Sequence, residues 1–98
     1  MAIVLRSFNI QNAAEHPFVK TNMDKKQMLA TVQSNVGSRL VYEAEILTVS
    51  EQGVAFMVLV DTDTDNEDEW KEKRLPVVNK VTAFLDNIFK KDLVVSES

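Results

Sequence analysis

The apolar pattern is strongest between Leu40 and Val60, where two β-branched, apolar-rich runs flank the short polar link 50–53. This pattern predicts an antiparallel hairpin, with strands over 40–49 and 54–60 and a turn closed by Gly53. We expect Gly53 to adopt a backbone conformation that other residues resist. The second strand is apolar on both faces, which is typical of a central strand or of one that meets a partner.

Strict alternation along 40–49 predicts which side chains share a face of the first hairpin strand. Leu40, Tyr42, Ala44, Ile46 and Thr48 would lie on one face, and Glu43 and Glu45 would mark the other face as solvated.

A further strand is predicted over 2–10, before the hairpin. We expect Ile3 and Leu5 to be buried in it, together with Phe8 or Ile10. The mixed, polar segment 11–20 follows, and we expect Pro17 to discourage a helix across it.

Two segments have the periodicity of amphipathic helices. The first runs from about Met23 to Val36, with Thr21 or Asn22 as its N-cap and Gly37 as a left-handed stop. The second begins near Pro76 and runs to about residue 91, and its apolar stripe consists of Val77, Val78, Val81, Phe84, Leu85, Ile88 and Phe89.

These elements predict a small two-layer α+β domain in the order β-α-β-β-α, with a central antiparallel hairpin covered by two amphipathic helices. Ninety-eight residues are enough for one domain, over 1–98, with an acidic loop at 61–69 and a flexible tail at 92–98. A chain of this size has a modest core, so self-association would bury further apolar area.

Composition narrows the function classes. The formal charge of −4 disfavours broad phosphate binding, and the absence of cysteine excludes disulfides and thiolate metal sites. The apolar run at the start is too short for a signal peptide and is interrupted by Arg6, and no run approaches the length of a membrane span. We expect a soluble, cytoplasmic protein with no cofactor and no membrane contact.

The acidic segment offers one metal hypothesis. Its carboxylates include Asp61, Asp63, Asp65 and Glu72, at positions one, three, five and twelve of a segment that resembles an EF-hand loop. The resemblance covers 61–72 alone, and it implies calcium binding. It departs from the EF-hand pattern where Asn66 replaces glycine, where Asp68 replaces an apolar residue, and where a strand leads in. A solvated acidic loop is the favoured interpretation, and occupation of a partner's basic groove is a further one.

Catalysis has little support in the pattern. His16 is the sole histidine, it precedes a proline, and no nucleophile motif accompanies it. We expect it to be solvent-facing or locally hydrogen-bonded. Glu43 and Glu45 could in principle do acid–base work, but two glutamates on an outer sheet face are ordinarily solvated.

Nucleic-acid binding is the alternative function that the charges allow. The candidate cations fall in two groups, namely Lys20, Lys25, Lys26 and Arg39, and then Lys71, Lys73 and Arg74. Phe18 and Trp70 lie near them in sequence and could stack on bases. The adjacent acidic run opposes phosphate, so this alternative is not favoured.

The sequence therefore favours a non-enzymatic interaction or regulatory module, homodimeric or acting as an inhibitor that binds a protein partner. The partner-binding residues we expect are Phe56, Val58, Trp70 and Phe89, with Asp61, Asp63, Asp65 and Glu67 in the acidic segment.

Overall fold

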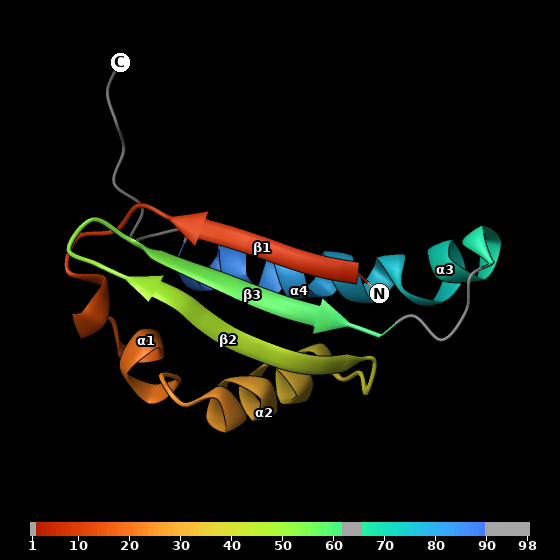
Figure 1. Cartoon of the computed structure of the whole chain (residues 1–98), viewed down its shortest axis with the longest axis horizontal. Coiled ribbons are helices and arrows are strands. Elements are labelled where there is room, and N and C mark those ends of the chain that lie inside the picture. Colours follow the sequence, from red (N-terminus) through yellow and green to blue (C-terminus); the bar gives the residue numbers. More distant parts are fainter. Residues whose placement is uncertain (1, 62–65, 90–98) are drawn as a thin grey trace, which may run out of the picture.

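The computed structural model describes residues 2–61 and 66–89. Within these ranges, strands β1 (Ala2–Phe8), β2 (Val41–Val49) and β3 (Val54–Val60) form one antiparallel sheet in the order β1-β3-β2. Helices α2 (Lys25–Val36) and α4 (Leu75–Phe89) lie on the same side of this sheet (Figure 1). The predicted α+β class and the central hairpin are confirmed.

Strand β3 is the centre of the sheet because it pairs with β1 on one side and β2 on the other. Its alternate side chains Val54, Phe56, Val58 and Val60 are buried against the helices. Helix α2 packs mainly on β2, whereas α4 packs on β1. The helix-facing layer of the sheet is therefore the core, and β3 has the central position that its two apolar faces predicted.

Strand β2 departs from strict alternation at two β-bulges. Tyr42 and Leu47 are the extra residues, since their neighbours keep partners in β3 and they have none. Each bulge shifts the register by one, so Val41 and Ala44 share the helix-facing side. The single face predicted for Leu40, Tyr42, Ala44, Ile46 and Thr48 is therefore wrong.

Strand β1 faces the core with different residues from those expected. Val4 and Phe8 are buried against the helices, whereas Ile3 is 58% and Leu5 is 63% exposed. The run 2–5 is apolar in both phases of a strand, so alternation could not decide between them. Pairing of Ile3 with Leu59 and of Leu5 with Met57 places them on the side away from the helices.

The first helical region starts differently from the prediction. Pro17 does not prevent a helix but opens one, α1 (Pro17–Thr21), after the 3₁₀ turn η1 (Ala13–Glu15). Asp24, rather than Thr21 or Asn22, caps α2, because its carboxylate accepts from the Gln27 amide at 3.1 Å.

The second helical region begins within the segment predicted to be an acidic loop. Helix α3 (Glu67–Lys73) follows Asn66, whose side-chain oxygen accepts from the Asp68 and Glu69 amides. The acidic residues of its first turn suit the positive end of the helix, so residues 67–69, which were predicted to be part of a loop, begin a helix.

Helix α4 brings its apolar stripe onto the sheet, with Val77, Val81, Leu85 and Phe89 buried. The Phe89 ring contacts the rings of Phe8, Phe18 and Phe56, with centroids 4.8–5.7 Å away. This aromatic cluster joins β1, β3, α1 and α4 at one end of the core.

The two glycines serve different purposes. Gly37 ends α2 at φ 70°, the left-handed conformation that was predicted. Gly53 lies outside the left-handed region, so the conformation expected for it is wrong. A Cβ at Gly53 would clash with the Phe8 carbonyl oxygen, so glycine is needed there for close backbone approach.

Replacement of these glycines should separate the two effects. We expect Gly53→Ala to lower the free energy of unfolding by about 1–3 kcal/mol, because the end of β1 must move away. Gly37→Asn should cost less than about 1 kcal/mol, because asparagine tolerates the left-handed region. Urea unfolding of both variants measures this, and an unchanged midpoint for Gly53→Ala would contradict the close approach.

The position of the α2 cap is testable in the same assay. Asp24→Ala should cost about 1 kcal/mol of stability because it removes the acceptor for the Gln27 amide. Thr21→Ala should leave stability within about 0.5 kcal/mol, since Thr21 is an exposed residue of α1. A larger loss of stability for Thr21→Ala than for Asp24→Ala would instead support the N-cap that was predicted from sequence.

Candidate interaction surface

The side of the sheet away from α2 and α4 is the candidate functional surface. We call it the open face, and it is built from three cross-strand rows, namely Ile3–Leu59–Glu43, Leu5–Met57–Glu45 and Ser7–Ala55–Thr48. In the ranges 2–61 and 66–89, none of the helices packs on this side of the sheet (Figure 1).

Four apolar side chains form a contiguous block over β1 and β3. Ile3 and Leu5 are more than half exposed, and their β3 partners Leu59 and Met57 are partly buried. Directly opposed residues of antiparallel strands have Cβ atoms about 5 Å apart, so these side chains touch one another. Isolated apolar residues on a surface are ordinary, whereas a joined apolar block on a sheet is a candidate contact surface.

A row of carboxylates borders this block on β2. Glu43 and Glu45 lie two residues apart and point to the open face, next to Leu59 and Met57. Lys25, from the start of α2, pairs with both, at 3.0 Å from Glu43 and 3.7 Å from Glu45. In the described part of the chain one ammonium group thus serves two carboxylates, which leaves one negative charge in excess.

The two carboxylates stabilise the charged form of the lysine. The pKa of Lys25 is raised above its ordinary 10.5, first by the hydrogen bond to Glu43 and then by the charge of Glu45. The Lys25 side chain is therefore positively charged at neutral pH.

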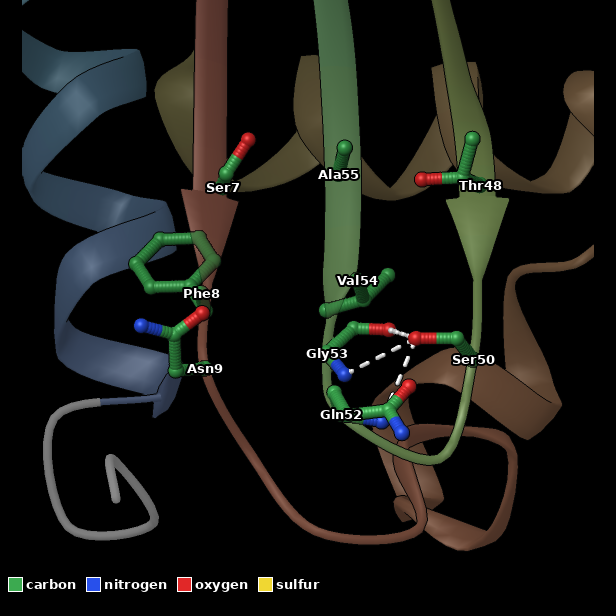
Figure 2. Close-up of a pocket in the computed structure, with 9 residues that line it drawn as sticks. All are labelled: Ser7, Phe8, Asn9, Thr48, Ser50, Gln52, Gly53, Val54 and Ala55. Carbon is green, nitrogen blue, oxygen red and sulfur yellow. Dashed lines mark hydrogen bonds between the residues drawn. The ribbon is translucent and has the colours of Figure 1, made fainter.

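The third row leaves a hollow at the turn end of the open face. Ser7, Ala55 and Thr48 are small and lie side by side across the three strands (Figure 2). The hollow has a volume of about 190 Å³ and opens to solvent. Residues of the β2–β3 turn also line the hollow. In this turn the Ser50 hydroxyl accepts hydrogen bonds from the Gln52 and Gly53 amides, each at 3.2 Å.

The residues that the sequence indicated for partner binding lie elsewhere. Phe56, Val58 and Phe89 are enclosed in the core. Trp70 is partly buried on α3, Glu67 is exposed in the first turn of that helix, and Asp61 follows β3. Asp63 and Asp65 lie outside the described residues. The structure does not gather the described members into one surface.

The open face could have been found from one sequence signal. The run 2–5 is apolar in both phases, as is 54–60, and the two runs pair with each other. Paired strands with two apolar faces, together with helices enough to cover one face, leave the second face without a helix.

The metal hypothesis concerns residues that the structure describes only in part. Across 2–61 and 66–89, no three carboxylate or imidazole groups lie together as a metal site requires. Asp61 and Glu72 fall in these ranges, but Asp63 and Asp65 do not, so calcium binding stays a prediction.

The candidate cations for nucleic-acid binding are dispersed and several are paired. Lys20 lies 3.2 Å from Glu15, and Lys71 lies 3.5 Å from Glu67. Arg74 is buried, and its Nε donates to the carbonyl of Asp61.

The remaining candidate cations lie on different parts of the fold. Lys26 is at the start of α2, Arg39 lies beyond its end, and Lys73 is on α3, so they do not form one basic groove. Binding of nucleic acid remains an untested alternative.

His16 has a local structural role. Its Nδ1 accepts from the Phe18 amide at 3.2 Å, which caps α1, and its ring lies 4.7 Å from that of Phe89. This agrees with the expectation of a locally hydrogen-bonded histidine.

No protein-family model, curated protein or solved structure matches the chain. The fold defines the chain as a small α+β domain, and no family match assigns a function to it. Among the helices in the described ranges, none is both long and apolar enough to cross a membrane.

The acidic border gives a prediction for titration. Because the pKa of Lys25 is raised, its contribution to stability is present below pH 10.5 and is lost as pH rises through the folded-state value. We expect the Lys25 side chain, followed by NMR, to titrate above its ordinary pKa, and to return towards it in a Glu43→Gln/Glu45→Gln double variant. An unchanged titration in that variant would contradict the pairing.

Proposed function

We propose that this chain is a non-enzymatic protein-interaction module that binds its partner through the open face. The observation that carries the proposal is the block formed by Ile3, Leu5, Met57 and Leu59, whose two outer members are more than half exposed. Binding would serve regulation or inhibition by covering a surface of the partner.

Burial of this block supplies a driving force. Removing apolar surface from water contributes about 25 cal/mol per Å², so covering Ile3 and Leu5 from their present exposure contributes on the order of 1–2 kcal/mol each. The block sits on strands of a rigid sheet, so little conformational freedom of the backbone is lost when a partner binds.

Two further parts of the proposal come from composition. We place the module in the cytoplasm, in keeping with a chain that has no cysteine. Self-association is the alternative to binding of a different protein, since a second copy would bury further apolar area of a small domain, and both are measured.

The test replaces one residue of the open face. Leu5→Glu should abolish binding, or reduce it by at least about tenfold, because a buried charge without a partner is costly. The assays are light scattering over a range of concentrations for self-association, and affinity capture from the native host followed by mass spectrometry.

A matched control separates the open face from general surface effects. Met23 is 58% exposed, comparable to Leu5, but it lies just before α2 and belongs to none of the three cross-strand rows of the open face. Met23→Glu should therefore retain both self-association and captured partners. The proposal fails if wild type is monomeric and captures nothing that Leu5→Glu loses, provided that thermal unfolding shows both variants folded.

A further inference from the structure

We propose that the occupant of the open face is an amphipathic α-helix of a partner protein, with basic residues along one border of its apolar stripe. This inference rests on the proposed function and names the partner's chemistry. It follows from the width of the apolar block, the excess charge on its border and the hollow at its end.

The dimensions of the block suit a single helix. Neighbouring strands lie about 4.8 Å apart, so the surface of β1 and β3 together is about 10 Å wide, which is close to the diameter of a helix. The apolar block covers two rows, from Ile3 to Leu5, which is about 7 Å along the strands or a little more than one helical turn. The whole seven-residue strand is about 23 Å long, the length of roughly 15 residues of helix. Such a helix would complete a third layer, opposite α2 and α4.

The negative charge of the border favours basic residues on the side of the partner helix that faces Glu43 and Glu45. Glu43 and Glu45 are separated by about 6.7 Å along β2, close to the rise of about 6 Å between helix positions i and i+4. Lysine or arginine at two such positions would meet both carboxylates, and one of these charges is not balanced by Lys25.

The same border disfavours a second copy as the occupant. Two stacked open faces would enclose four glutamates with two lysines, because each copy brings Glu43, Glu45 and Lys25. Desolvated carboxylates without full pairing oppose association. A basic flank removes this penalty, so complementarity favours a different protein.

The hollow gives the helix a preferred register. Ser7, Ala55 and Thr48 leave space at the end of the apolar block, where a side chain longer than its neighbours can insert (Figure 2). The hydroxyls of Ser7 and Thr48 can accept or donate hydrogen bonds there, so a long side chain with a polar end fits best.

Two synthetic helical peptides test the proposal. Both carry the same leucine stripe, and one has lysine at two border positions four residues apart where the other has glutamate. We expect the lysine peptide to shift the NMR methyl signals of Ile3, Leu5, Met57 and Leu59. It should also bind at least about tenfold more tightly than the glutamate peptide.

Three variants assign the effect to the border. Glu43→Gln/Glu45→Gln should remove the preference for lysine, whereas Glu69→Gln/Glu72→Gln, the same charge change on the exposed face of α3, should retain it. Lys25→Met should tighten binding of the lysine peptide, because it frees the second carboxylate. This gain remains measurable if the double glutamine variant of the border does not fold.

The outcomes separate this inference from the proposed function. Equal binding of both peptides, or no methyl shifts with either, overturns the helix proposal. If the methyl signals instead move with protein concentration, or if host proteins are captured in a Leu5-dependent way without peptide binding, the open face is an interaction surface for another occupant. Absence of all these effects overturns both proposals.

Discussion

The structure depends on the pairing of β3 with a strand on each side. This pairing buries one face of β3 under α2 and α4, and it fixes which residues of β1 and β2 face the core. Phe56 belongs to this layer and contacts the rings of Phe8, Phe18 and Phe89. Because two helices cover one side of a three-stranded sheet, the second side keeps its apolar residues at the surface.

Elements whose apolar residues follow a single periodicity could be predicted from sequence. In strand β1, which is apolar on both faces, the sequence could not show which face is buried. The apolar stripe of α4 and the left-handed Gly37 follow directly from spacing and residue type. The exposure of Ile3 and Leu5 does not, because Ala2 and Val4 are also apolar and pairing with β3 decides the phase. Helix α3 could not be predicted because the acidic composition of its first turn indicated a loop, although Asn66 can cap a helix.

The acidic border shows how a site can be assembled from separate predictions. Glu43 and Glu45 could be placed on a solvated face from their spacing, yet their contact with Lys25 requires α2 to lie along β2. Alternation alone also could not reveal the bulges that bring Ala44 and Val49 to the core side. The apolar block and the carboxylates therefore become neighbours only once the three strands are paired.

The two bulges have a consequence for the outer edge of β2. An edge strand with a regular row of free amides and carbonyls is a template for addition of strands from other molecules. At Tyr42 and Leu47 the ladder is interrupted, so this row is out of step with any straight incoming strand. Addition of a further strand along the outer edge of β2 is thereby disfavoured.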